Sequence, residues 1–195
     1  MNKKVCSFPI LFALLALLIG TCAVVFPASA QAAPTSTGSI TVSGTVASSY
    51  DAYQIFSANV VDGDSDAKIA TELAWASDAV RDAALPVLHS AGMPNSQTTV
   101  QEAAEWLNTD SHLTSALSAQ LARSLQSSGA VSVALNAGTT AELPCGYWLI
   151  VAKDDAISQN EAGTAPVMVL VGGSAVTVKP KAATPKVAKH VLEDS

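Results

Sequence analysis

The sequence predicts a mainly β protein: a β-sandwich with an inserted block of two to four short helices, followed by the first strand of a second β-sandwich. Roughly seven short apolar stretches alternate with turn residues, as in sandwich domains. Between them, residues 77–128 change to the apolar spacing of helices. An apolar helical stripe must lie against a sheet to be buried, so the helices are expected to cover one side of the sandwich.

The chain has 195 residues, which fits one domain with accessory segments. It carries 10 Lys+Arg against 16 Asp+Glu residues, and two of the lysines, Lys3 and Lys4, stand at the N-terminus. The rest of the chain is therefore strongly acidic and lacks the positive surface that binds phosphate backbones. We expect no nucleic-acid partner.

Residues 1–30 have the pattern of a secretory signal peptide, because the two lysines precede an apolar run over 10–26 and small residues follow. Cleavage is expected near Ala30 or Ala32, which leaves an exported protein without a membrane segment. One alternative is an uncleaved membrane anchor, since the apolar run is nearly long enough to span a bilayer. A lipoprotein attached through Cys22 is disfavoured by the threonine before that cysteine.

A flexible lead-in is expected at 31–37, before a domain that spans 38–180. Residues 39–46 alternate between apolar and polar side chains, which predicts a half-buried strand. The aromatic-rich stretch 50–56 and residues 68–75 are predicted as the next strands.

An acidic turn, Asp62-Gly63-Asp64-Ser65-Asp66, follows the second of these strands. Its carboxylates occupy alternate positions, as in a calcium-binding loop. Ala67 stands where that loop needs glycine, and Leu73 stands where it needs glutamate. A solvated acidic turn is therefore favoured over a calcium site.

Helix signals place several elements within 77–128. Pro86 is expected to divide the first piece into one helix that ends near Ala84 and another that begins at the proline. Thr99–Glu102 forms a capping box that begins the next helix. Asp110-Ser111 is expected to cap the last helix, which Gly129 ends. Its apolar stripe repeats every four residues: Leu113, Leu117, Leu121 and Leu125.

Strands return after the helices. Residues 131–135 form one strand, and 146–152 is apolar on both faces, as expected of a central strand covered on both sides. Residues 166–171 and 174–179 flank Gly172-Gly173, which predicts a β-hairpin.

No catalytic or metal-binding constellation is present in the sequence, so we expect neither an enzyme nor a cofactor or metal. The three histidines, His89, His112 and His190, lack metal-ligand spacing, and there is no Gly-x-Ser-x-Gly elbow. Cys145 alone remains after signal cleavage, so no internal disulfide can form, and its apolar surroundings predict a buried, unreactive thiol. Core packing is expected for the tryptophans, which are Trp75, Trp106 and Trp148.

Several stretches together resemble the N-terminal region of a Gram-positive sortase-assembled backbone pilin, a fimbrial subunit with an isopeptide-forming second domain. They are 50–56, the strand ending in Trp75, the helical insertion, 143–150 and 185–191. The likeness covers nearly all of 38–191. It implies an Ig-like pilin β-sandwich at 38–180, then a linker and the first strand of a truncated isopeptide-forming domain at 181–195.

The resemblance implies two lysine roles. Val176-x-Val178-Lys179-Pro180-Lys181 is similar to the pilin motif Val-x-Val-Tyr-Pro-Lys, whose lysine a pilin sortase joins to the next subunit, so Lys181 is the candidate for an inter-subunit link. Lys179 departs from the motif's tyrosine, and an ordinary linker lysine is the alternative. Lys189 matches a lysine that forms an intramolecular amide. Its partner asparagine and acid are absent from this sequence, and a surface lysine is the alternative. We expect a fragment of a longer reading frame, and a truncated product is the other possibility.

The positions of the lysines predict whether an internal amide can form within the first domain. No lysine occurs between Gln31 and Ala67, so the first strands cannot supply an amine. We therefore expect no internal isopeptide bond within 38–180.

The expected function is that of a non-enzymatic subunit of a covalently polymerised fimbria, exported and attached to the cell wall, that supports cell adhesion. Its expected partners are other pilin subunits, joined by a pilin sortase, and host surface ligands. Two alternatives stay open: a secreted, unpolymerised ligand-binding β-sandwich adhesin module, and an N-terminal accessory domain of a larger secreted enzyme.

Overall fold

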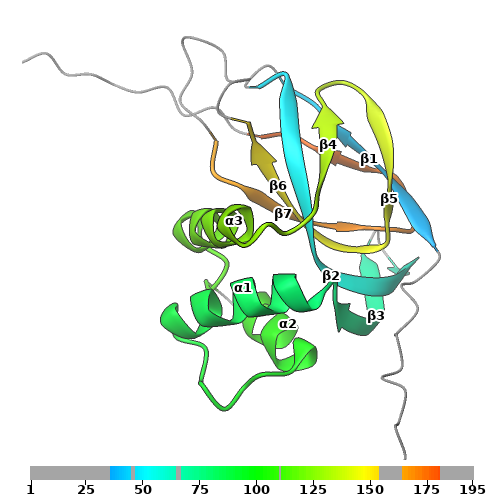
Figure 1. Ribbon diagram of the computed structural model, residues 1–195. Helices are drawn as coiled ribbons and strands as arrows, with labels where there is room; N and C mark the ends of the chain where they lie inside the picture. Colours follow the sequence, from blue (N-terminus) through cyan, green and yellow to red (C-terminus); the bar gives the residue numbers. More distant parts are fainter. Residues whose placement is uncertain (1–35, 45–46, 65–66, 110, 154–163, 181–195) are drawn as a thin grey trace, which may run out of the picture. The chain divides into compact units, whose positions relative to one another are not determined.

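The structure is a computed structural model that describes residues 36–44, 47–64, 67–109, 111–153 and 164–180. Within these residues the protein is mainly β, with two sheets, and three helices lie together against one side of the larger sheet (Figure 1). This confirms the predicted β-rich fold with a helical insertion. The predicted signal peptide and the segment from Lys181 onward lie outside the described residues.

The smaller sheet has the order β5-β1-β8, with β1 in the middle. β1 runs antiparallel to β5 and parallel to β8. Its predicted span of 39–46 is shifted, because β1 begins at Thr37 and ends at Val42. β5 was not predicted, since Leu143 is its one fully buried residue and so short a stretch shows no clear period. The strands are β1 (Thr37–Val42), β5 (Thr140–Pro144) and β8 (Val176–Val178).

The larger sheet is built around β2, which is twice as long as predicted and continues to Asp62. One edge of β2 pairs first with β4 and then with β3, and its other edge pairs with β6. β6 pairs in turn with β7, so the predicted central position of 146–152 is confirmed. The strands are β2 (Ser49–Asp62), β3 (Lys68–Trp75), β4 (Ser132–Asn136), β6 (Gly146–Ala152) and β7 (Val167–Val171).

The predicted hairpin at Gly172-Gly173 is wrong. β7 pairs with β6, whereas β8 pairs with β1 in the other sheet, so the two glycines carry the chain from one sheet to the other. Both have positive φ angles, 132° and 61°. A Cβ on Gly172 would lie 2.6 Å from Val60 Cβ and 2.8 Å from Cys145 Sγ, so only glycine fits this close crossing.

The first helix, α1 (Asp78–Ser90), runs through Pro86 without a break, which corrects the predicted division into two helices. A proline inside a helix loses the hydrogen bond to the carbonyl four residues earlier, here that of Asp82. Both Asp82 and Pro86 are exposed, so water can bond that carbonyl. Continuing the helix buries Leu88, which is 1% exposed, and this burial offsets the lost bond.

The next helices are α2 (Val100–Asn108) and α3 (Ser115–Ser128). The predicted capping box of α2 is confirmed, with both reciprocal bonds between Thr99 and Glu102 present. The predicted cap of α3 at Asp110-Ser111 is wrong, because Thr114 caps this helix and its hydroxyl accepts a bond from Leu117 N at 3.1 Å. Gly129 ends α3 in the left-handed conformation, as predicted.

Leu113, predicted as part of the apolar stripe of α3, lies before the helix and is 43% exposed. The residues between α2 and α3 are held by a different contact. His112 stacks on Trp106 with ring centroids 4.2 Å apart, and His112 Nδ1 lies 2.7 Å from Trp106 O. This contact keeps the chain near α2 until Thr114 begins α3.

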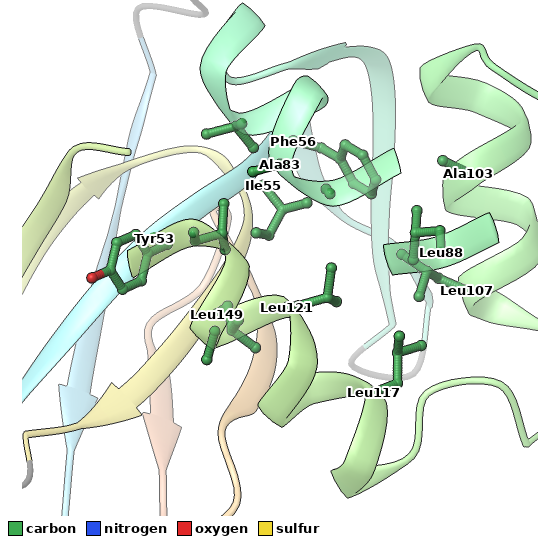
Figure 2. Close-up of a cluster of buried hydrophobic side chains, with 14 of the residues drawn as sticks. Tyr53, Ile55, Phe56, Ala83, Leu88, Ala103, Leu107, Leu117, Leu121 and Leu149 are labelled. Carbon is green, nitrogen blue, oxygen red and sulfur yellow. The ribbon is translucent and has the colours of Figure 1, made fainter. Parts of the chain in front are cut away.

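Two apolar clusters occupy the two faces of the larger sheet. The helical cluster joins the side chains of Tyr53, Ile55 and Phe56 to the helices (Figure 2). The sheet cluster joins Tyr50 and Ala52 to the smaller sheet. β6 contributes to both, since Leu149 belongs to the helical cluster whereas Trp148 and Ile150 belong to the sheet cluster, which confirms that this strand is covered on both faces.

The cap of α3 is testable by substitution. Thr114→Ala removes the oxygen that accepts the Leu117 N–H bond, and should lower the free energy of unfolding by about 1 kcal/mol in urea titrations. Ser111→Ala is the matched control and should change it by less than about 0.5 kcal/mol. A larger loss in the Ser111 variant would restore the cap predicted from the sequence.

Candidate functional site

The candidate site is the place where the chain leaves the described domain, at the end of β8. Val178 is buried, whereas Thr177 and Lys179 are exposed, as the alternation of a strand requires. Both the main-chain nitrogen and the hydroxyl of Ser43 donate to Val178 O, at 2.8 and 3.3 Å. Lys179 is thus presented to solvent. The candidate link residues Lys181 and Lys189 lie outside the described residues.

A polar network lies just before β8. It consists of Asp62, Lys68 and Ser174, and we call it the latch. Lys68 Nζ donates to Gly172 O at 2.5 Å, to Ser174 O at 2.7 Å and to Ser174 Oγ at 3.0 Å. It also lies 3.3 Å from Asp62 Oδ1. Asp62 accepts the Ser174 N–H at 2.8 and 3.0 Å and the Ser174 hydroxyl at 3.0 Å. The latch therefore joins the β2–β3 hairpin to the crossing between β7 and β8.

Sequence reasoning missed the latch. Asp62 and Lys68 are directly opposite each other at the end of the β2–β3 pair, which pairing of the two predicted strands would have revealed. Ser174 is 106 residues beyond Lys68, and no local pattern indicates that contact. The acidic turn is thus only partly solvated, since its first carboxylate has fixed partners.

The latch lowers the pKa of the Asp62 carboxyl below its ordinary value of 3.8. The Ser174 backbone N–H is the main cause, and the Ser174 hydroxyl and the Lys68 ammonium add to it, while partial desolvation opposes the shift. Because the pKa is depressed in the folded state, the carboxylate stabilises the fold above the ordinary pKa. This stabilisation is lost as the pH falls through the folded value.

The contacts of Asp62 do not suit the calcium alternative. An N–H, a hydroxyl and an ammonium group point at its oxygens, and all three are hydrogen-bond donors that a metal ion would have to displace. In the part of the chain that the structure describes, no three His, Cys, Asp or Glu side chains gather as a metal site. Ser65 and Asp66 lie outside that part.

Among the described residues, two lysines lie close to an aspartate. An amide between a lysine and an acidic side chain would be expected at one of these two pairs. Lys68 lies 3.3 Å from Asp62, and Lys153 lies 3.3 Å from Asp51. Amide formation needs an uncharged amine that attacks a protonated carboxyl group. Lys68 instead donates to several oxygens, and the pKa of Asp62 is lowered, so the carboxyl group of the first pair is held in its charged form.

An apolar groove of about 200 Å³ lies between α2 and the edge strand β7. Its mostly apolar lining offers surface to an apolar ligand. Its lining residues are Phe56, Ala104, Leu107, Asn108, Leu113, Tyr147, Met168, Val169 and Leu170.

The remaining predicted residues have structural roles. Cys145 is 1% exposed, which confirms the predicted buried thiol. Trp148 is buried and donates to Pro144 O at 2.9 Å, whereas Trp75 and Trp106 are half-buried and pack against the helical cluster. His89 Nε2 lies 2.9 Å from the main-chain oxygen of Gln97, so the two described histidines each contact a backbone carbonyl.

No family model matches the chain, and a search of curated proteins finds no match. Across the described residues, no helix has both the length and the apolar character needed to cross a bilayer.

The latch makes stability depend on pH in one direction. Asp62→Asn should lower the urea midpoint of unfolding most at neutral pH, and the difference from the wild type should shrink as the pH falls below the ordinary pKa of 3.8, because protonation then weakens the wild-type latch as well. Asp64→Asn, two residues away, is the control and should change the midpoint little at any pH. A pH-independent difference for Asp62→Asn would contradict the role of its charge.

The absence of an internal amide from 38–180 remains a prediction, and intact mass tests it. After signal cleavage, the purified chain should have the mass of its residues, with no loss of water or ammonia. A loss of one water localised to Lys68 and Asp62, or to Lys153 and Asp51, would show a cross-link at one of the two close pairs.

Proposed function

We propose that this protein is a structural, non-enzymatic subunit of a covalently polymerised surface fimbria that supports cell adhesion. In this proposal the protein is exported through its signal peptide, and Lys181 is joined by a pilin sortase to the next subunit on the cell wall. Lys189 serves in an internal amide of a following domain. The first domain is an Ig-like pilin β-sandwich.

The observation that carries the proposal is how the motif around Lys181 is presented. Val178, inside the motif, is buried at the end of the last described strand, and the next residue, Lys179, is exposed. The motif therefore begins in a strand of the smaller sheet and turns to solvent at Lys179. The linkage asks for an exposed primary amine just beyond a strand, and β8, which β1 and the latch hold in place, ends at Val178, three residues before Lys181.

A secreted ligand-binding adhesin module is the second candidate, and the apolar groove favours it. Leu107, on α2, lines the groove and is also part of the helical cluster. The two candidates differ in what the surface protein does: a fimbrial subunit forms covalent polymers, whereas an adhesin module binds its ligand as a single chain.

The experiment is to express the gene with its native pilin sortase and to examine cell-wall extracts on denaturing gels. The wild type should give a ladder of high-molecular-weight species, and Lys181→Arg should abolish it, because arginine keeps the charge but is not a usable amine nucleophile. Lys179→Arg, an exposed lysine two residues earlier, is the matched control and should keep the ladder.

A ladder that persists in the Lys181→Arg variant would remove this lysine as the link. If the wild type also forms no ladder, the fimbrial proposal fails and the adhesin module becomes the better candidate.

A further inference from the structure

The first and last strands of the described domain pair side by side and in parallel. Ile40, Thr41 and Val42 of β1 stand opposite Val176, Thr177 and Val178 of β8. Among the described strands β1 is the first and β8 is the last, so tension from the two ends of the chain reaches them at the start of β1 and at the end of β8. In a parallel pair these two points lie at opposite ends of the pair.

We propose that the β1–β8 pair is a mechanical clamp that resists tension applied through the two ends of the domain. Tension between the entering and leaving chains acts along the strands, so it loads the hydrogen bonds between them together. An antiparallel terminal pair would instead be peeled apart one bond at a time. Resistance to forced unfolding follows the barrier to unfolding, and simultaneous loss of several bonds raises that barrier.

β1 is also held on its other edge. It pairs with β5 over five residues, from Thr37–Pro144 to Thr41–Thr140. The Thr41 and Thr140 hydroxyls are 2.8 Å apart, and Ser39 donates to the Glu142 carboxylate. β1 cannot slide past β8 without also breaking this second ladder.

The buried faces of the two strands add to the resistance. Ile40 and Val42 are each 1% exposed and Val178 is 6% exposed, and all three belong to the sheet cluster. Shear of the pair would expose these side chains to water as well as break hydrogen bonds.

The latch supports the weaker partner of the clamp. β8 has only three residues, and β1 is its one strand partner among the described strands. Immediately before β8, Lys68 and Asp62 fix Ser174 to the β2–β3 hairpin. Load that reaches the start of β8 is therefore passed to the larger sheet.

The biological use of the clamp rests on the proposed function, because a fibre subunit is pulled from both ends. The clamp itself is a property of one chain and does not require polymerisation. A force measurement on single molecules and the ladder assay can therefore fail independently.

The test is single-molecule force spectroscopy on the chain that remains after signal cleavage, with handles at its two termini. The comparison attaches one handle at Ser48→Cys, an exposed position after β1, and the other at the C-terminus. Buried Cys145 stays unlabelled. Pulling from the termini should give a high-force unfolding event, which should be lost in the Ser48 geometry because β8 is then peeled from β1. Equal forces in the two geometries would overturn the clamp.

The role of the latch is tested by Lys68→Met, pulled from the termini. The unfolding force should fall in this variant and stay unchanged in Lys153→Met, which removes a lysine at the same 3.3 Å distance from an aspartate but outside the clamp. If Lys68→Met does not fold, Ser174→Ala removes one latch hydroxyl and should lower the force in the same direction. Equal forces for the Lys68 and Lys153 variants would show that the latch carries no load.

Discussion

Burial of both faces of β2 is the constraint on which the rest of the structure depends. Tyr53, Ile55 and Phe56 face the helices, and Tyr50 and Ala52 face the smaller sheet, so one strand belongs to both apolar clusters. The β2–β6 register shifts between Gln54 and Phe56, which gives β2 an extra residue and turns two consecutive large side chains to the helical side. Neither the helices nor the smaller sheet could bury their apolar faces without this strand.

The crossing between β7 and β8 depends on the same strand. β2 continues to Asp62, and that carboxylate meets Ser174 and Lys68 where the chain changes sheets. The latch precedes β8, and the exposed Lys179 follows it. A domain proposed to transmit tension would thus have its exit strand anchored to both sheets without a covalent bond, as long as Asp62 stays ionised.

Local signals predicted local structure well. The Thr99–Glu102 capping box and the end of α3 at Gly129 were correct, because each depends on bonds within one helical turn. The prediction at Pro86 failed, since the burial of Leu88 outweighs one missing main-chain hydrogen bond on the exposed side of the helix. The hairpin predicted at Gly172-Gly173 is also wrong, because these glycines allow the chain to cross close to Val60 rather than to turn back on itself.

The sequence by itself determined the β-rich class, the helical insertion and the two-sided burial of 146–152, because apolar periodicity records which faces avoid water. It also set the acidic balance that argues against nucleic acid. The tertiary structure alone decided that β8 pairs with β1 in parallel and that Lys68 reaches Ser174, 106 residues away. Such partners are chosen by the packing of the whole core, and no local period encodes which distant strand will lie beside another.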